Sequence, residues 1–437
     1  MFKKVLSLVL MVAMLCTLTI SFASCGTVTA DMTEAPLAEV SLKKDFDIPD
    51  DFKIGIICLH DEASTYDLNF INGVEKIKTV LGLSNEQVIY KKNIDESAAC
   101  TEAAEDLVDQ GCKIVFANSF GHESFLLEAA KKHPEVEFCH ATGTMAHTEE
   151  IDNFHNAFAS IYEGRFLAGV AAGMKLNEMI DAGKITAEQA KMGYVGAFTF
   201  AEVISGYTSF YLGAKYICPS VTMEVQFTGS WYNETEEKNA AIALMNNGCV
   251  LISQHADSMG APSACEEKGV PNVSYNGSTQ KSCPDTYIVS SKIDWTPYFV
   301  YICNSVKDGN AIDTDWTGTI STGSVALTEV NTKAAAAGTQ AKIDEIKAKL
   351  VSGELKVFDT STFTVTVDTT GEFPLNGNAK VDENGHLTSY KADVDTDAAF
   401  TGDTEVVKDG YFHESENRCA PYFDVQIDGI KLLNSKF

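Results

Sequence analysis

The feature that most constrains this sequence is an alternation of short apolar stretches and helical stretches, which occurs twice. The first series begins with the apolar stretch KIGIICL at residues 53–59, and the second begins at residues 194–198, after a polar stretch at 181–191. Apolar runs rich in β-branched residues are typical of strands buried on both faces, and helices between such strands indicate parallel sheets. The sequence therefore predicts an α/β fold with two doubly wound parallel-sheet lobes.

The order of these stretches also predicts where each lobe begins and ends. Segments late in the chain would return to both lobes and build hinge crossovers between them. After residue 358 the sequence becomes rich in Thr, Asp and Gly, which indicates strands and turns. The expected parts are an N-terminal lobe over 51–180 (completed by about 295–310 and 333–358), a C-terminal lobe over 190–292 (completed by about 316–331) and a β-rich C-terminal extension over 359–437.

The start of the chain has the composition of an export signal. Two lysines precede an apolar run at 5–20, and small residues stand directly before Cys25, which resembles a bacterial lipobox. Phe22 departs from the usual leucine, so an ordinary secretory signal cleaved nearby is the alternative. We predict a lipoprotein signal over 1–25 with a lipid on Cys25, and a flexible tether over 26–50 at the outer face of the cytoplasmic membrane.

The charge and the cysteines exclude several classes of protein. The chain has 33 basic and 61 acidic residues, a formal net charge of −28, which argues against nucleic acid as a partner. Of the 12 cysteines, two lie in the first 25 residues, and most of the others lie inside apolar strand or helix patterns. No two of them form a CxxC pair, so we interpret them as small buried hydrophobic residues and not as zinc ligands.

Sequence motifs for catalysis and metal binding are absent. Five histidines lie between residues 122 and 155, but on different predicted elements, and HESFL at 122–126 lacks the second histidine of a zinc-protease motif. The chain contains no GxSxG, no P-loop and no GxGxxG after a strand. We therefore expect no metal, no cofactor and no enzymatic activity.

A predicted helix at 162–179 contains three closely spaced glycines, Gly164, Gly169 and Gly173. This spacing resembles the motif of paired membrane helices, but charged residues flank it. We predict instead a soluble helix that packs closely against a sheet.

Several short sequence motifs, taken in their order along the chain, resemble those of one known family. The motifs are HDEASTYDLNFINGV, IVFANSFGH, FCHATG, IYEGRFLAGVAAG, GYVGAF, EVISGY, GSWYNETEEKNAA, VLISQHADS and SYNGS. Their order resembles the basic membrane protein (BMP) family of lipoproteins, the purine-nucleoside-receptor-like branch of the type I periplasmic-binding fold, over roughly residues 52–360. The resemblance implies an extracellular receptor of an ABC importer, with an ABC permease as partner and purine nucleosides or nucleobases as usual ligands.

The chain departs from the family in the loop after the first strand. Where the purine-binding branch often has Gly-Trp-Thr, residues 65–67 are Thr-Tyr-Asp. Where the nucleoside branch has Asp-x-Ser-Phe-Asn, residues 66–70 are YDLNF. The ligand could therefore differ from that of either branch.

Candidate ligand contacts follow from the strand ends. In parallel sheets ligands bind beyond the carboxyl ends of the strands, and two facing sheets place these ends in one cleft. A purine needs flat apolar faces for stacking and directional groups for its edges. Residues of these types at predicted strand ends are Tyr66, Asn118, Ser119, Phe120, Phe198, Trp231, Gln254, Asp257, Asn276 and Trp295. Each has a structural alternative, such as a helix N-cap for Asp257 or packing for Trp295.

From these observations the sequence predicts an exported, lipid-anchored solute-binding receptor that closes two lobes around a purine nucleoside or nucleobase. The same fold also serves receptors for sugars and other small polar solutes. A ligand sensor that signals to a membrane kinase is a further alternative. A nucleoside hydrolase is disfavoured because the chain has no catalytic motif.

Overall fold

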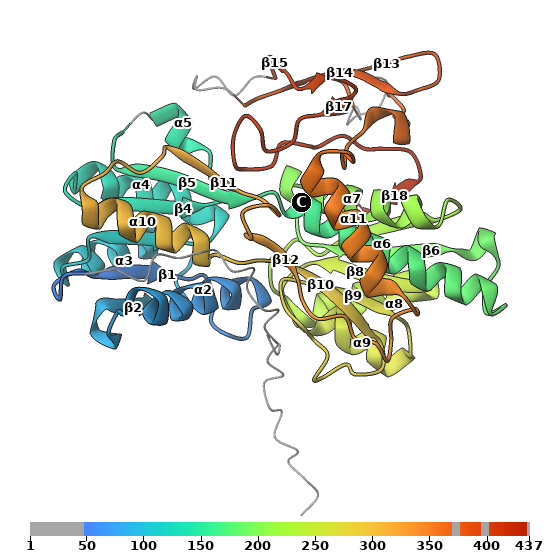
Figure 1. The fold of residues 1–437 in the computed structure, drawn as a ribbon, viewed down its shortest axis with the longest axis horizontal. Coiled ribbons are helices and arrows are strands. Elements are labelled where there is room, and N and C mark those ends of the chain that lie inside the picture. Colours follow the sequence, from blue (N-terminus) through green and yellow to red (C-terminus); the bar gives the residue numbers. More distant parts are fainter. Residues whose placement is uncertain (1–47, 150, 369–375, 395–401, 435–437) are drawn as a thin grey trace, which may run out of the picture.

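The computed structural model describes residues 48–149, 151–368, 376–394 and 402–434, which form two α/β lobes side by side (Figure 1). The first lobe contains one parallel sheet in the order β11-β5-β4-β3-β1-β2. Its strands are β1 (Ile54–Ile57), β2 (Val88–Lys91), β3 (Ile114–Ala117), β4 (Glu137–Ala141), β5 (Phe154–Ala159) and β11 (Asp315–Gly318). Its helices are α2 (Thr65–Leu81), α3 (Ala98–Asp109), α4 (Glu123–Lys132), α5 (Met145–Glu149) and α10 (Thr296–Asp308).

The second lobe contains a sheet in the order β12-β10-β9-β8-β6-β7-β18. All its pairs are parallel except β10 with β12. Its strands are β6 (Lys191–Gly196), β7 (Thr222–Phe227), β8 (Leu251–His255), β9 (Asn272–Tyr275), β10 (Tyr287–Ile293), β12 (Val325–Leu327) and β18 (Ile430–Leu432). Its helices are α6 (Ile161–Asp181), α7 (Ala201–Ile217), α8 (Glu234–Asn246), α9 (Gly260–Lys268) and α11 (Thr339–Ser352).

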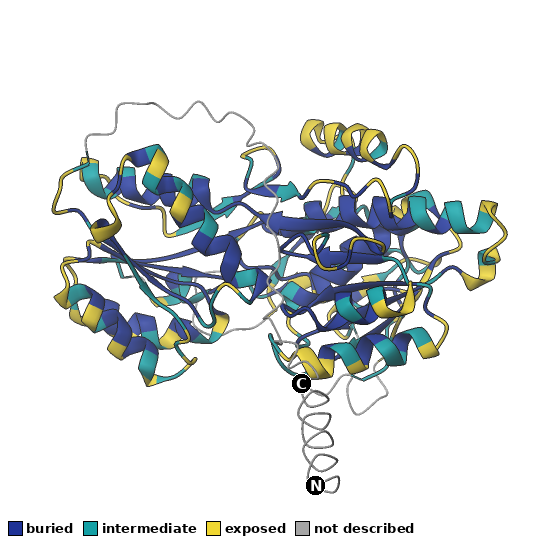
Figure 2. Cartoon of the chain, turned by 90° about the horizontal axis from the view of Figure 1, so that it is seen from below, coloured by how far each residue is buried: buried dark blue, intermediate teal, exposed yellow. Residues whose placement is uncertain are grey.

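Both sheets are covered by helices, and the buried residues gather in the strands and on the inner helix faces (Figure 2). Of the strands that begin the two series, β1 is buried along its length and β6 from Met192 onward, because apolar side chains on both faces need cover on both faces. The predicted α/β class with two sheet-based lobes is confirmed. The second sheet departs from the prediction only in its antiparallel edge strand β12.

The chain crosses between the lobes three times, and the structure corrects how the late segments are divided. β11, expected to complete the C-terminal lobe, pairs with β5 in the first sheet. Helix α6, expected in the N-terminal lobe, packs against α7 and β10 of the second lobe. Helix α11, expected to complete the first lobe, packs against α6. Pairing at a hinge depends on contacts far apart in the sequence, which hydrophobic periodicity does not encode.

The glycines of α6 allow it to approach α7 closely. A methyl group at Gly169 would lie 2.0 Å from the Phe210 carbonyl oxygen, and one at Gly213 would lie 2.0 Å from the Phe166 carbonyl oxygen. Gly164 instead faces the sheet, because a methyl group there would lie 2.9 Å from Val325. The prediction that this helix packs closely against a sheet is therefore confirmed at Gly164, whereas at Gly169 the helix packs against another helix, α7.

We expect Gly169→Ala to lower the free energy of unfolding by about 1–3 kcal/mol, because the two helix backbones must move apart. Urea unfolding followed by circular dichroism measures this change. Gly377→Ala is the matched control, since a methyl group there meets no atom within 4 Å. Equal stability of the two variants would contradict the close packing of α6 and α7.

The C-terminal extension is β-rich, as predicted, and contacts both lobes (Figure 1). Its strands are β13 (Ala379–Val381), β14 (Leu387–Ala392), β15 (Thr404–Glu405), β16 (Val407–Lys408) and β17 (Tyr411–Phe412), and β18 joins the edge of the second sheet beside β7. The Cys419 amide donates to Asp315 Oδ2 of the first lobe at 2.6 Å. The Tyr207 hydroxyl of the second lobe donates to Gln426 Oε1 at 2.7 Å. The extension therefore ties the two lobes together.

Several predictions concern residues at the start of the chain. The signal over 1–25, the lipid site Cys25 and most of the tether lie outside the described residues. Within the described ranges, no helix combines the length and apolarity that a membrane span needs. The cysteines in those ranges are all buried and carry free thiols, as expected for small hydrophobic residues.

Candidate functional site

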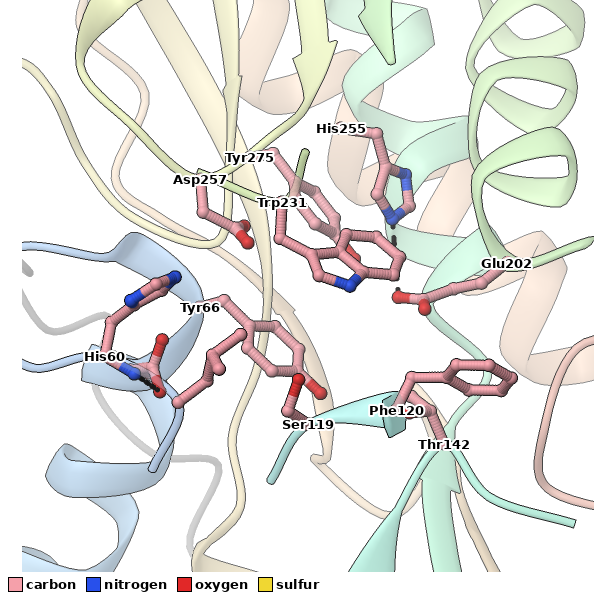
Figure 3. Close-up of a pocket in the computed structure, with 12 residues that line it drawn as sticks. His60, Tyr66, Ser119, Phe120, Thr142, Glu202, Trp231, His255, Asp257 and Tyr275 are labelled. Atoms are coloured by element: carbon pink, nitrogen blue, oxygen red, sulfur yellow. Dashed lines mark hydrogen bonds and ion pairs between the residues drawn. The ribbon is translucent and has the colours of Figure 1, made fainter. Parts of the chain in front are cut away.

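A pocket lies between the two lobes, with a volume of about 380 Å³ that includes space open to solvent (Figure 3). All its residues lie at or just beyond the carboxyl ends of strands, where a parallel sheet is expected to place a ligand. The first lobe contributes Leu59, His60, Tyr66, Asp67, Ser119, Phe120 and Thr142, and the second contributes Glu202, Trp231, His255, Asp257 and Tyr275.

The start of α2 shows how local sequence builds this wall. Ser64 is the N-cap, and its hydroxyl accepts a hydrogen bond from the Asp67 amide at 3.2 Å. The helix ends at Gly82, whose φ of 72° is left-handed. The first turn of α2 therefore faces the cleft and presents Tyr66 and Asp67 to it.

Five of the ten predicted contacts line the pocket: Tyr66, Ser119, Phe120, Trp231 and Asp257. They follow four different strands, β1, β3, β7 and β8, and come from both lobes. Trp231 lies in the middle of the pocket as Figure 3 shows it, with Asp257 and Glu202 on either side. Contact of these residues with a ligand stays a prediction.

Two of the other predicted residues support the pocket from behind. Asn118 Nδ2 donates to Asp67 Oδ1 at 2.7 Å, and Asn118 Oδ1 accepts from the Leu59 amide at 3.1 Å. Asn276, with a φ of 61°, accepts a hydrogen bond from Asn69 Nδ2 at 3.0 Å. Both amide side chains position loops instead of lining the pocket.

The remaining three predicted residues are used in packing or in the sheet. Phe198 stacks on Phe200 at 5.2 Å and meets Trp231 edge-on at 5.0 Å. Gln254 accepts a hydrogen bond from Asn272 at 3.2 Å. Trp295 is 1% exposed and stacks on Phe70 at 4.3 Å. None of these three lines the pocket in the described structure, and Trp295 belongs to the hydrophobic core.

Several pocket residues were not predicted, although the same rule would have found them. His255 and Tyr275 are the last residues of β8 and β9. Glu202 lies in the first turn of α7, directly after a strand and its loop. On β8 the side chains of Gln254 and His255 point to opposite faces of the sheet, and His255 is the one that lines the pocket. The strand-end rule gives positions, but the face of each residue needs the sheet itself.

The two lobes touch around the pocket. The Thr65 amide donates to the Asp257 carbonyl oxygen at 3.1 Å, and the Asn69 amide group donates to Asn276 across the same boundary. The rings of Phe120 and Phe200, which are 42% and 38% exposed, meet at 5.2 Å from opposite lobes. The structure therefore shows a closed arrangement with an aromatic contact beside the pocket.

The pocket is acidic. Its twelve described lining residues include three carboxyl groups, on Asp67, Glu202 and Asp257, two histidines, and no lysine or arginine. A site lined by one sign of charge repels ligands of the same sign. The pocket therefore disfavours phosphate and carboxylate groups and favours neutral ligands with hydrogen-bond donors.

Asp257 is the most strongly perturbed of these acids. Burial raises the pKa of its carboxyl well above the usual range, and the nearby charges of Glu237, Asp67 and Glu202 raise it further. Glu237 supports the same loop, because it accepts hydrogen bonds from the Asn233 amide at 3.0 Å and the Ser258 amide at 3.2 Å. Burial raises the pKa of Glu237 to about 7. Perturbed acids in a cleft are typical of functional sites.

A family model described as "ABC transporter substrate-binding protein PnrA-like" matches residues 58–361. The chain belongs to this PnrA-like family. Family members are solute-binding proteins and not enzymes, so the resemblance inferred from the sequence is confirmed.

Two curated relatives of this PnrA-like chain are named after different ligands. A purine-binding protein of Brucella abortus is 30% identical over 223 residues, covering 51% of this chain and 59% of the relative. A putative ABC transporter glucose-binding protein of Haloferax volcanii is 30% identical over 206 residues, covering 47% of this chain and 49% of the relative. The chain thus matches about half the length of these relatives.

Solved structures show the same fold. An ABC transporter solute-binding protein from Aeropyrum pernix superposes with a TM-score of 0.59 at 16% identity, covering 70% of this chain and 93% of that one. A solute-binding protein from Conexibacter woesei gives a TM-score of 0.56 at 18% identity, covering 70% and 98%. About 30% of the PnrA-like chain therefore lies outside the shared fold, and residues after 361 lie outside the family match.

Proposed function

We propose that this PnrA-like protein is an extracellular receptor of an ABC importer that binds a purine nucleoside or nucleobase between its lobes. The observation that carries the proposal is the composition of the pocket: Trp231 and Tyr66 offer ring faces, while Asp67, Glu202 and Asp257 offer acceptors without a nearby cation among the lining residues. Stacking of a base on an aromatic side chain contributes roughly 1–3 kcal/mol. The name of the Brucella relative supports the same ligand class.

The remaining parts of the proposal rest on the sequence and the family. Closure of the lobes would bury the ligand and present a surface to a permease. A lipid on Cys25 and the tether that follows would hold the receptor at the outer face of the membrane. An acidic pocket fits an uncharged nucleoside better than a nucleotide.

A sugar receptor is the second candidate, and one comparison favours it. The Haloferax relative is named as a putative glucose-binding protein. Aromatic rings also stack on sugars, and carboxylates accept hydrogen bonds from their hydroxyl groups. The two ligand classes differ in that only a purine has an aromatic ring system that interacts electronically with Trp231.

Tryptophan fluorescence separates these candidates. The chain has three tryptophans, and Trp231 is the one that lines the pocket, whereas Trp295 is in the core. We expect adenosine or a free purine base to quench the fluorescence in a saturable way, because the base stacks on the indole. Glucose would leave the emission nearly unchanged.

Trp231→Phe is the control for the origin of this signal. A phenylalanine ring keeps an aromatic face, so we expect affinity to fall by less than about tenfold while the quenching amplitude is lost. Calorimetric titration measures the affinity of this variant. Purine quenching that persists in Trp231→Phe, or its absence in the unmodified protein, would contradict the proposed stacking.

A further inference from the structure

A fully buried arginine lies beneath the second-lobe side of the pocket. Arg165 Nη1 donates to the Ser274 carbonyl oxygen at 3.2 Å and to Ser291 Oγ at 3.3 Å. Its Nη2 donates to Tyr194 Oη at 3.2 Å and to Ser253 Oγ at 2.7 Å. These four acceptors are all uncharged, so the guanidinium is held by dipoles. An arginine side chain has only donors, which fixes the direction of each of these hydrogen bonds.

Aromatic rings complete the surroundings of this cation. The guanidinium carbon lies 4.8 Å from the ring centroid of Phe210 and 5.4 Å from those of Tyr194 and Tyr275. Cations are stabilised over aromatic faces, more so where water is excluded. Arg165 therefore places a fixed positive charge behind Tyr275, which itself lines the pocket.

The hydrogen bonds continue from Arg165 to the pocket in one direction. Tyr194 Oη accepts from Arg165, and burial raises the pKa of Tyr194 to about 12, so its own proton is available to donate. Tyr194 Oη also lies 3.3 Å from His255 Nδ1. Burial lowers the pKa of His255, so its imidazole is neutral. We assign Nδ1 as the nitrogen without a proton, because it faces the Tyr194 hydroxyl while Nε2 faces a carboxylate oxygen that can only accept.

The proton of the neutral imidazole must then be on Nε2. His255 Nε2 lies 3.4 Å from Glu202 Oε1 and donates to it, as the dashed line in Figure 3 marks. The face of Tyr275 packs on the His255 ring at 4.1 Å and restrains its orientation. The relay Arg165–Tyr194–His255–Glu202 thus ends on a carboxylate in the pocket, and Oε2 of that carboxylate takes no part in the relay.

We propose that Glu202 is a specificity-determining residue that accepts a hydrogen bond from an N–H group on the edge of the bound base. The inference rests on the proposed function and deepens it, because it selects among purines. The relay holds Oε1 of the Glu202 carboxylate. Oε2 is then left to accept a hydrogen bond from the ligand, and it has no proton to donate. Purines with an N–H donor on the six-membered ring therefore bind more tightly than purines without one.

Calorimetric titration with four nucleosides tests this selectivity. Adenosine, inosine and guanosine each carry at least one N–H donor on the six-membered ring, whereas purine riboside carries none. We expect the best of the three to bind the unmodified protein about 10- to 100-fold more tightly than purine riboside, as for a hydrogen bond to a charged acceptor. Equal affinity for all four would overturn the inference and leave purine binding in place.

Two variants of Glu202 sharpen the test. In Glu202→Ala we expect the affinity for purine riboside to change little. The preference for nucleosides with an N–H donor over purine riboside should fall below about threefold. In Glu202→Gln the relay holds the amide oxygen toward His255 Nε2 and turns the amide NH₂ toward the ligand, so the preference should reverse. A purely structural role of Glu202 would instead weaken all four nucleosides by the same factor and would contradict the inference.

Two further proteins complete the experiment. Glu236→Gln removes an exposed carboxylate on α8 and should keep the full preference. Tyr194→Phe preserves the ring but breaks the relay, so Glu202→Gln in that background should lose its reversed preference, because the imidazole proton is no longer fixed on Nε2. Failure of every nucleoside and of free adenine to bind the unmodified protein would overturn the proposed function together with this inference.

Discussion

We expect Asp257→Asn to lower purine affinity by roughly 10- to 100-fold, the loss that follows when a buried hydrogen bond to a charged acceptor is replaced by one to a neutral amide of the same shape. Asp257 lies at the carboxyl end of β8, is 6% exposed and faces the ligand pocket. Isothermal titration calorimetry with adenosine measures the change. Asp285→Asn, an exposed position outside the pocket, should bind as the unmodified protein does.

Asp257→Asn should also reduce the pH dependence of purine affinity. Because burial and three neighbouring acids raise the pKa of Asp257, its carboxyl is protonated in the empty closed form at pH values where an exposed aspartate is ionised. A ligand that donates a hydrogen bond favours the ionised form, so binding releases a proton and affinity rises as pH rises toward that pKa.

Titrations at one pH in buffers with different heats of ionisation measure this proton release. The unmodified protein should release a fraction of a proton for each purine bound, and Asp257→Asn should release less. Identical release from both proteins, or net proton uptake by the unmodified protein, would contradict the role of Asp257 as an acceptor.

We expect Phe423→Ala to lower the free energy of unfolding by about 3–5 kcal/mol, the usual cost of truncating a fully buried aromatic ring. Phe423 is 0% exposed, stacks on Phe358 at 4.1 Å and meets Phe412 at 4.7 Å. Urea unfolding measures the loss, and Val351→Ala, at a 49% exposed position, should change stability by less than about 0.5 kcal/mol.

This result would show that the extension is an integral part of the fold. Phe358 also contacts Tyr162, near the start of α6 and the crossover from β5, at 5.3 Å. Loss of Phe423 should therefore destabilise the body of the protein in the same unfolding transition. A separate early transition of the extension, with the main transition unchanged, would contradict that coupling.

Local signals in the sequence were enough to predict the two-lobe α/β fold. Apolar runs predict the buried strands, and residues that favour helix ends, such as Ser97 before α3 and Gly269 after α9, cap the helices between them. The edge strand β11 was assigned to the other lobe because its partner, β5, is about 160 residues away in the chain and nothing local selects it.

Half of the ligand contacts predicted from the sequence line the candidate pocket. The strand-end rule found aromatic and acidic residues such as Trp231 and Asp257, because position along a parallel strand decides whether a residue reaches the cleft. It failed for Trp295 and Asn118, since bulk and polarity suit a core stack or a loop support as well as a ligand. The Arg165 relay could not be predicted, because it joins four elements through side chains.

The central claim, purine binding between the lobes, is tested most directly by calorimetric titration of the purified protein with adenosine, adenine and glucose in parallel. The account predicts saturable binding of a purine at one site per chain, with a negative heat-capacity change from burial of apolar surface, and no heat from glucose. Saturable binding of glucose with no response to either purine would contradict it.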